Sequence, residues 1–292
     1  MIEMAAERAA TGGIGGQSSP EKEGGRRTHD VQRTSLPGKP LVSIITVVFN
    51  NGSTIEDTIR SIESQTYRNV EHIVIDGGST DQTLGVIQRH QHKIAQFISE
   101  PDRGIFDAMN KGLLLATGDV VALLNADDIY ADAGVLQRMA DVFADPAVEV
   151  CYADLVYVDP QDMDKPVRYW KSSAFRPGLF GRGWVPAHPT FFARRSAYQQ
   201  YGGYDESLGL AADFELMLRL LERYRLKSVY IPQVSVKMRL GGASNRSIRN
   251  IVRQNIDIMR ACRKNHVPVS LLFFFAKPWA KLSQYVMRPA GS

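Results

Sequence analysis

The sequence predicts an α/β fold built on a mostly parallel, doubly wound sheet. An apolar, β-branched run over residues 41–49 is typical of a strand buried on both faces, and a loop and a helix pattern follow it. Residues 70–75 begin a second unit of the same kind, again with a loop and a helix pattern behind the strand. Consecutive strand–loop–helix units favour parallel strands joined by crossovers, which is the arrangement of a doubly wound sheet.

Two capping boxes mark the first two helices. In a capping box, a serine and a Glu or Gln three residues later accept hydrogen bonds from the free backbone N–H groups of the first turn. The two boxes are Ser53-x-x-Glu56 and Ser79-x-x-Gln82. The apolar residues expected to face the core are Ile55, Ile59 and Ile62 in the first helix, and Leu84 and Ile87 in the second. The turns before these helices carry glycine, so backbone N–H groups there could hold phosphate. They match neither the dinucleotide fingerprint nor a P-loop.

The remaining patterns predict further strands and helices around this sheet. The run over 120–124 is long enough for one buried strand and too short for a helix. Short alternating runs after Pro146 predict a small antiparallel appendage. In order, the expected elements are a helix over 106–115, the strand over 120–124, a helix over 132–143 with Val135, Met139 and Val142 inward, strands over 148–152, 155–158 and 167–170, a helix over 211–224 with Phe214, Met217, Leu218 and Leu221 inward, a strand over 234–240, and a last long helix with Ile248, Ile251, Val252 and Met259 on one stripe.

Composition and charge exclude several classes of protein. The chain has 292 residues, of which 44% are hydrophobic and 23% charged, as in ordinary globular proteins. A net charge of +4 is too mild to predict binding to nucleic acid. The two cysteines, Cys151 and Cys262, lie far apart, which argues against a structural disulfide or a zinc site and favours a reducing cytoplasm.

The N-terminal residues resemble neither a signal peptide nor a folded segment. Residues 1–39 are rich in Gly, Ser, Glu, Arg and Lys and have no apolar periodicity, so we expect a disordered leader. No stretch of about 20 apolar residues occurs, so no helix is expected to span a membrane.

The C-terminal residues combine apolar and basic side chains. Residues 267–287 mix Leu and Phe with Lys277, Trp279 and Lys281, a composition that suits the headgroup region of a bilayer. Ten residues of helix reach about 15 Å, half the hydrocarbon thickness, so this segment would lie on an anionic membrane. A dimer contact or a helix that covers the core is the alternative. After Leu240 the basic residues are Arg246, Arg249, Arg253, Arg260, Arg263, Lys264, Lys277, Lys281 and Arg288, against the single acid Asp257.

Two adjacent carboxylates end the strand over 120–124. In an open α/β sheet, ligands bind beyond the carboxyl ends of the strands, so Asp127 and Asp128 are expected in the cleft. Their mutual repulsion and their oxygen ligands suit a hard divalent cation, Mg²⁺ or Mn²⁺. A solvated loop or a helix cap is the alternative explanation, because Asp is common in both.

Other polar residues are candidates for the same site. Arg103, Asn110 and Lys111 could meet a phosphate or sugar hydroxyls, since they precede the buried strand on a polar segment. His188 is either a structural histidine or a ligand or phosphate donor. Asp213, in the first turn of a helix, either complements the helix dipole or acts as a general base.

With these residues in hand, the chain resembles the family 2 glycosyltransferases, inverting enzymes of the GT-A fold, and looks closest to the bacterial branch that builds exopolysaccharide and glycolipid sugars. The similarity runs from about residue 40 to residue 247. Six stretches in order carry it, over residues 43–50, 74–81, 99–112, 125–128, 188–192 and the segment around Asp213.

The resemblance implies a role for each matching residue. Phe49 and Asp76 match the positions that grip the nucleotide base and ribose, Asp127 matches the metal carboxylate with Asp128 beside it, and Asp213 matches the general base. The expected nucleotide-sugar contacts are Val47, Phe49, Asn50, Asp76, Arg103, Asn110, Lys111, Asn125, Ala126, Asp127 and His188. The implied cofactor is Mn²⁺ or Mg²⁺. Two positions depart from the family pattern: Asn125 replaces the first acid of the Asp-x-Asp motif, and Ala212 replaces the acid before the base.

The resemblance also implies a domain organisation and partners. A GT-A catalytic domain is expected over 40–243, with a nucleotide-binding half over 40–130 and an acceptor half over 131–243. Residues 244–292 would form a helical, membrane-associating segment. The implied donor is a nucleoside-diphosphate sugar and the acceptor a lipid-linked sugar or polysaccharide, with the protein peripheral on the inner face of the cell membrane.

Two other functions remain open at this point. A non-catalytic module that binds saccharide or nucleotide is compatible with Asn125 and Ala212. A sugar nucleotidyltransferase would need a glycine-rich, Arg-containing loop after the first strand, which residues 50–53 do not supply. The sequence names neither the donor sugar, the nucleotide nor the acceptor, and it leaves the oligomeric state open.

Overall fold

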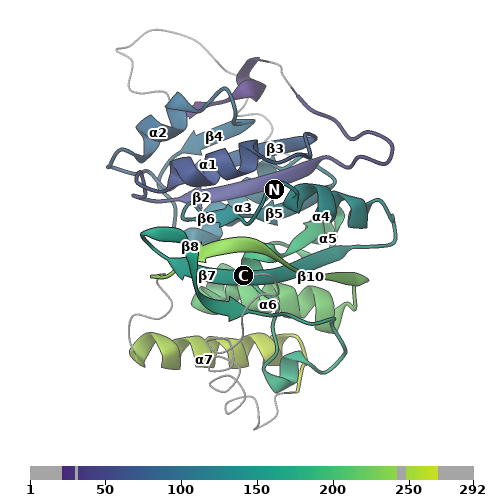
Figure 1. Ribbon diagram of the computed structural model, residues 1–292. Coiled ribbons are helices and arrows are strands. Elements are labelled where there is room, and N and C mark those ends of the chain that lie inside the picture. Colours follow the sequence, from purple (N-terminus) through teal and green to yellow (C-terminus); the bar gives the residue numbers. More distant parts are fainter. Residues whose placement is uncertain (1–21, 30–31, 242–247, 269–292) are drawn as a thin grey trace.

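The computed structural model describes residues 22–29, 32–241 and 248–268, which build a ten-stranded sheet with helices on both faces (Figure 1). The strands are β1 (Glu23–Gly24), β2 (Val42–Val48), β3 (Val70–Asp76), β4 (Gln96–Ser99), β5 (Val120–Leu123), β6 (Asp128–Tyr130), β7 (Val150–Asp159), β8 (Asp162–Trp170), β9 (Phe192–Arg194) and β10 (Ser228–Arg239). The helices are α1 (Ile55–Glu63), α2 (Thr83–Arg89), α3 (Ile105–Leu115), α4 (Val135–Phe143), α5 (Arg195–Tyr201), α6 (Ala212–Leu218) and α7 (Ile248–Lys264).

The order of the strands is β1-β4-β3-β2-β5-β9-β7-β10-β6, and β8 pairs with β7. Strands β4, β3, β2 and β5 are parallel to one another, as are β7 and β10, whereas β1, β6, β8 and β9 pair antiparallel. The predicted α/β class with a doubly wound sheet is therefore confirmed.

Helices cover both faces of this sheet because its central strands are apolar on both. Every residue of β2 and β3 is buried. Helices α1 and α2 pack on one face with Val48 and Val74, and α3 and α6 belong to the cluster on the other face with Ile45 and Ile73. Figure 1 shows α7 outside α6, at the far end of the molecule from α2.

The predicted appendage differs from the observed structure. The two short strands expected over 148–152 and 155–158 form the single strand β7, which lies within the main sheet and pairs with β8, β9 and β10. Alternate side chains of β7 enter two different cores: Tyr152 joins the cluster beside α6, and Cys151 and Ala153 join the cluster beside α4. The alternation that led to the predicted appendage is typical of strands with one solvated face, whereas β7 is buried on both faces over most of its length.

Part of the expected leader is also ordered. Residues 23–24 form the edge strand β1 on β4, and residues 26–29 form a 3₁₀ turn. Arg27 pairs with Glu71, a carboxylate that is 2% exposed and also accepts hydrogen bonds from Ser43 Oγ (2.6 Å) and the Thr117 amide (2.7 Å). A buried carboxylate needs such partners, so Arg27 holds this segment against the sheet. Residues 1–21 lie outside the described part of the chain.

The capping boxes are not formed. Thr54, not Ser53, precedes α1, and its hydroxyl donates to the carbonyl oxygen of Ala126 at 2.8 Å. Helix α2 begins at Thr83, whose amide donates to the Asp81 carboxylate at 2.9 Å. Both helices therefore begin after the serine that the sequence predicts as the cap.

The apolar stripe predicted on the last helix is exposed. In α7 the buried side chains include Ile258, Ala261 and Cys262, whereas Val252 and Met259 are 53% and 42% exposed. The side chains of Ile248 and Ile251, and the predicted membrane segment after residue 268, lie outside the described part of the chain. Among the described residues, no helix is both long and apolar enough to cross a bilayer.

The predicted helix over 211–224 is divided. Regular α-helix extends over α6, and the following turn, Arg219–Arg223, has the wider π geometry. The inward residues Phe214, Met217, Leu218 and Leu221 are buried as predicted.

Candidate active site

Three parallel strands end at one edge of the sheet, and most of the predicted site residues follow them. The register pairs Val48 of β2 with Asp76 of β3, and Ile45 of β2 with Leu123 of β5. Phe49 and Asn50 therefore emerge beside Asp76, and the segment 125–128 emerges next to them. This edge is where open α/β sheets bind their ligands.

The loops after β2 and β3 form one wall of the site. Asn50 has a φ of 48°, and its side-chain oxygen accepts hydrogen bonds from the amides of Thr80 (2.8 Å) and Asp81 (3.4 Å). The Asn50 amide donates to Ser79 Oγ at 2.7 Å. The adjoining ring of Phe49 is 62% exposed. An exposed aromatic ring on a loop held this firmly is suited to stack on a planar ligand.

Asp76 lies at the base of this wall and is fully buried. Its carboxylate accepts hydrogen bonds from Ser99 Oγ (2.6 Å) and from the Ser79 amide (3.2 Å), and it also contacts the Ser79 hydroxyl. Gly77 follows, and a Cβ there would lie 2.4 Å from a carboxylate oxygen of Asp102, so a larger residue would displace this side chain of the loop after β4. The structure thus brings Phe49, Asn50 and Asp76 together.

The carboxylates of Asp127 and Asp128 occupy different environments. Asp128 is fully buried; one of its oxygens accepts a long hydrogen bond from Asn125 Nδ2 (3.4 Å), and the other, Oδ1, has no partner among the described residues. Burial, together with the negative charge of Asp127, raises the pKa of Asp128 well above its usual range. Asp127 is half-buried, and burial raises its pKa too, an effect that Arg239 and His188 partly oppose.

Arg239, at the end of β10, supports this pair of acids and was missed by the sequence analysis. Its Nη1 donates to the carbonyl oxygen of Asp127 at 3.1 Å, and its Nη2 donates to Asp57 of α1 at 2.5 Å. The side chain is 11% exposed. Arg239 therefore fixes the turn that carries Asp127. No local pattern could have revealed this contact, because it joins residues far apart in the sequence.

His188 and Asp213 approach the acids from the second half of the sheet. His188 begins the 3₁₀ turn His188–Thr190, and Asp213 lies in the first turn of α6. Their side chains meet with Nδ1 and Oδ2 3.4 Å apart. A protonated His188 would lower the pKa of Asp127, and its ring contacts Asp213, so His188 lies near both acids.

Tyr157 of β7 provides a second link between the two sides. Burial raises the pKa of its phenol, and the carboxylates of Asp128 and Asp213 raise this pKa further. The guanidinium of Arg168 lies 3.7 Å from the centroid of the Tyr157 ring. Tyr157 and Arg168 belong to the antiparallel β7–β8 hairpin, which the sequence analysis assigned to a small antiparallel appendage.

The remaining predicted contacts are engaged within the protein. Both polar atoms of the Asn110 side chain bind the backbone of Tyr204, at 2.8 and 2.9 Å. Lys111 pairs with Glu100 at 2.8 Å and donates to the carbonyl oxygen of Pro101 at 3.1 Å. These two residues hold α3 to its neighbouring loops.

The last three predicted contacts are Val47, Ala126 and Arg103, and they differ in whether the side chain can reach a ligand. Val47 and Ala126 are buried in the core, and the Ala126 carbonyl oxygen is taken by Thr54. Arg103 bonds Asp107 at 2.7 Å, yet its side chain is 76% exposed, so it can still reach into solvent.

The acids at the edge of the sheet fit a divalent cation in part. Among the described residues, no three His, Cys, Asp or Glu side chains gather into a metal-binding group. Asp127 and Asp128 nevertheless supply two carboxylates. The Oδ1 atom of Asp128 has no partner in the described part of the chain, and the pKa values of both side chains are raised. A bound cation would contact that oxygen and stabilise both carboxylates in the ionised form. Mg²⁺ is commonly bound through one or two carboxylates, with water and ligand phosphates completing the shell. This donor set therefore fits a cation held jointly with a phosphate ligand.

Residues 43–202 match the family model described as "Glycosyl transferase family 2". An uncharacterized glycosyltransferase of Mycobacterium tuberculosis is 34% identical over 188 residues, covering 63% of this chain and 70% of the relative. A PGL/p-HBAD biosynthesis glycosyltransferase of Mycobacterium bovis is 27% identical over 252 residues, covering 85% of this chain and 94% of the relative.

Two solved structures share the architecture. The mannosyltransferase PcManGT from Pyrobaculum calidifontis, solved in complex with GDP-Man and Mn²⁺, matches with a TM-score of 0.58 and 19% identity, over 89% of this chain and 78% of that one. TarS from S. aureus, in complex with UDP-GlcNAc, matches with a TM-score of 0.56 and 16% identity, over 77% and 72% of the two chains. These likenesses identify the fold described above as the GT-A fold.

Proposed function

This chain belongs to glycosyl transferase family 2 and is a glycosyltransferase, and on that basis we propose that it moves a sugar, with inversion at the anomeric carbon, from a nucleoside-diphosphate sugar to a lipid-linked or polysaccharide acceptor. The observation that carries the proposal is the contact between His188 Nδ1 and Asp213 Oδ2, 3.4 Å apart, together with the electrostatic influence of His188 on Asp127, which follows β5. On this basis we propose that acids from the two halves of the sheet face one site.

The donor would lie along the wall formed after β2 and β3. The exposed ring of Phe49 is available to stack on the base, and Asp76 lies at the end of the adjacent strand, where a ribose would follow. The two structural neighbours were solved in complex with GDP-Man and UDP-GlcNAc, which supports a nucleotide sugar as the donor here.

The diphosphate would lie against Asp127 and Asp128. A divalent cation held there would act as a Lewis acid on the departing phosphate oxygen, a contribution of several kcal/mol in enzymes of this kind. Arg239 holds the backbone that presents Asp127, and the exposed guanidinium of Arg103 can add a charge-assisted hydrogen bond to a phosphate oxygen. The complex of PcManGT with Mn²⁺ supports the choice of cation.

Asp213 would act on the acceptor. Transfer requires that the attacking hydroxyl loses its proton as it bonds to the anomeric carbon, while the bond to the phosphate breaks on the opposite face. A carboxylate within hydrogen-bond reach can accept that proton. The Asp213 carboxylate contacts His188, which holds it in the region that Asp127 also faces. A single displacement of this kind inverts the anomeric carbon and needs no covalent nucleophile.

The experiment that tests this function uses the full chain and a panel of nucleotide sugars. With Mn²⁺ and a lipid-linked acceptor, one nucleotide sugar is expected to yield free nucleoside diphosphate together with a glycosylated acceptor of inverted configuration. Calorimetric binding of nucleotide sugars without any release would indicate a binding module instead. Release of pyrophosphate from a nucleoside triphosphate and a sugar phosphate would indicate a nucleotidyltransferase, and either outcome would contradict the proposal.

We also propose that the protein works as a peripheral protein on the inner, anionic face of the cell membrane, where a lipid-linked acceptor would be found. Helix α7 supports this, because Val252, Ile256 and Met259 form an exposed apolar stripe, 53%, 46% and 42% exposed, beside the exposed Arg253 and Arg260. Apolar side chains flanked by arginine are typical of helices that lie in the headgroup region. The name of the M. bovis relative, a PGL/p-HBAD biosynthesis glycosyltransferase, supports a glycolipid product.

A double substitution tests the role of this stripe. Val252→Ser with Met259→Ser is expected to weaken partitioning onto anionic vesicles about tenfold, because two half-exposed apolar side chains no longer insert. Co-sedimentation with vesicles measures the effect. Leu36→Ser with Leu114→Ser, which alters two exposed apolar residues elsewhere, is the matched control. Equal losses in both variants, or no loss in either, would contradict a specific role for α7.

A further inference from the structure

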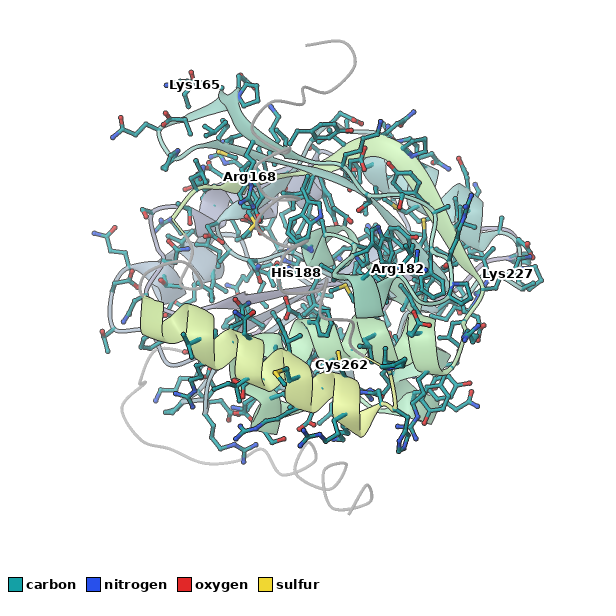
Figure 2. The ribbon with its side chains drawn as sticks, turned by 90° about the horizontal axis from the view of Figure 1, so that it is seen from below. Lys165, Arg168, Arg182, His188, Lys227 and Cys262 are labelled. Carbon is teal, nitrogen blue, oxygen red and sulfur yellow. The ribbon has the colours of Figure 1, made fainter. Side chains whose placement is uncertain are left out.

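A cavity of about 780 Å³ is lined by none of the residues at the carboxyl ends of the parallel strands. Three segments meet around it: residues 177–182 after β8, residues 222–225 after α6, and residues 265–268 after α7. Gly181 approaches the Pro268 carbonyl oxygen so closely that a Cβ would lie 2.4 Å from it, so the first and third segments are packed together. In Figure 2, Arg182 lies towards the end of α7 that carries Cys262.

The lining of this cavity is strongly cationic. It includes the exposed side chains of Arg182, Arg223 and Arg225, together with His266. The Arg182 amide donates to the carbonyl oxygen of Leu179 at 3.0 Å, whereas its guanidinium has no hydrogen-bonding or ionic partner among the described residues. The Arg223 guanidinium makes a long hydrogen bond of 3.5 Å to Asn265 and lies 5.1 Å from the centroid of the Tyr224 ring. Arg225 is 59% exposed and donates from Nε to the carbonyl oxygen of Glu222 at 2.9 Å, which leaves its two terminal nitrogens. All three guanidiniums therefore have donors left for a ligand.

The one carboxylate in this lining is occupied. Glu222 is 8% exposed, and its two oxygens accept hydrogen bonds from the Gly178 amide at 2.8 and 3.0 Å. The distance from Glu222 Oε1 to Arg225 Nη2 is 3.9 Å, which is too long for a hydrogen bond. Glu222 thus anchors the loop over residues 177–182 and neutralises at most one of the three arginines.

Two lining residues have an unusual backbone. Arg225 and His266 each have a φ of 58°, and together with Asn50 they are the non-glycine residues with positive φ in the described chain. This conformation is disfavoured for residues with a long side chain and persists only where the surroundings enforce it. It directs the chain so that both residues line the same cavity.

The segment that follows the cavity lining has no side chain that could neutralise this charge. Residues 269–292, which follow Pro268, contain no Asp or Glu and add Lys277, Lys281 and Arg288. An anion from outside is therefore the complementary occupant. Guanidinium groups bind phosphate through paired N–H donors, which makes phosphate the best match for three converging arginines.

We infer that this arginine pocket, defined by Arg182, Arg223 and Arg225, binds the phosphate group of a ligand. The pocket is separated from the proposed base by an aromatic layer, since the Phe180 ring contacts the Phe214 ring with centroids 5.6 Å apart and Phe214 follows Asp213. A phosphate bound there could belong to a membrane lipid headgroup or to a phosphorylated acceptor. The inference does not depend on glycosyl transfer, because binding can be measured without a donor.

The experiment compares two triple variants of the full chain. Arg182→Gln, Arg223→Gln and Arg225→Gln remove the pocket arginines, and Lys22→Gln, Lys39→Gln and Arg89→Gln remove the same charge from exposed positions elsewhere. Two probes are used. Binding of inorganic pyrophosphate is measured by calorimetry in EDTA, and partitioning is measured on phosphatidylcholine vesicles with or without phosphatidylglycerol. Loss of three charge-assisted donors is expected to weaken binding at least about tenfold in the pocket variant, and less than about twofold in the control.

The pattern of loss identifies the source of the phosphate. Weaker binding of pyrophosphate alone indicates a soluble or acceptor-borne phosphate, and weaker partitioning onto phosphatidylglycerol vesicles indicates a headgroup. In the wild type, the effective probe should also protect the three arginines from phenylglyoxal, as mapped by mass spectrometry. Equal binding by the two triple variants, or the absence of protection, would overturn the inference whether or not the protein transfers sugar.

Discussion

Asp213→Asn is expected to bind nucleotide sugar as tightly as the wild type and to lose about 10²–10⁴-fold in transfer rate, because the amide cannot accept the proton of the acceptor hydroxyl. The substitution keeps the shape of the side chain and leaves an oxygen that can face His188, 3.4 Å from the present carboxylate. Donor affinity by calorimetry and kcat by product formation separate the two effects.

Asp141→Asn is the matched control for this substitution. Asp141 is an exposed acid on α4, and its change from acid to amide should leave both donor binding and kcat unchanged. A wild-type kcat in Asp213→Asn would remove Asp213 from the role of base. A large loss of donor affinity with an unchanged kcat would assign it to the donor site instead.

Asp127→Ala is expected to abolish measurable turnover, with a loss of at least about 10³-fold, since it removes the carboxylate that would hold the cation beside the leaving phosphate. The second readout is Mn²⁺ binding in the presence of nucleoside diphosphate, followed by electron paramagnetic resonance. Metal affinity should fall with turnover, whereas folding, measured by thermal unfolding, should be retained because Asp127 is only half-buried.

The pH dependence of this Mn²⁺ binding follows from the same residue. Burial raises the pKa of Asp127, and the cation needs the ionised carboxylate. Binding is therefore complete at pH values above this raised pKa and declines as the pH falls through it, at a higher pH than for an exposed aspartate. An Asp127→Ala enzyme with wild-type turnover and wild-type Mn²⁺ affinity would show that the metal, if used, is held elsewhere.

The half of the sheet that contains β2, β3 and β5 was predictable because its signals are local. The mainly apolar runs of these strands and the polar residues directly after them are contiguous in sequence, so strand ends and site candidates could be assigned together. Parallel pairing then brings Phe49, Asp76 and Asp127 to the same edge without further information.

The parts that were not predictable depend on contacts between distant residues. Arg239 binds the Asp127 carbonyl oxygen across 112 positions, and nothing around either residue indicates the partner. Asn110 looked like a sugar ligand because of its neighbours, yet both its polar atoms bind the Tyr204 backbone. Tyr157 was assigned to an appendage because its run was interpreted as a short alternating strand, whereas β7 is a strand of the main sheet that is buried over most of its length.

The central claim concerns the relative positions of Asp127 and Asp213 around the donor, and a crystal structure of the Asp213→Asn variant with Mn²⁺ and an intact nucleotide sugar tests it most directly. The account predicts the diphosphate and Mn²⁺ at Asp127, and the anomeric carbon between Asp127 and residue 213, with the amide on the face opposite the phosphate. A donor bound in another cavity, or backbone lying between the anomeric carbon and residue 213, would contradict it.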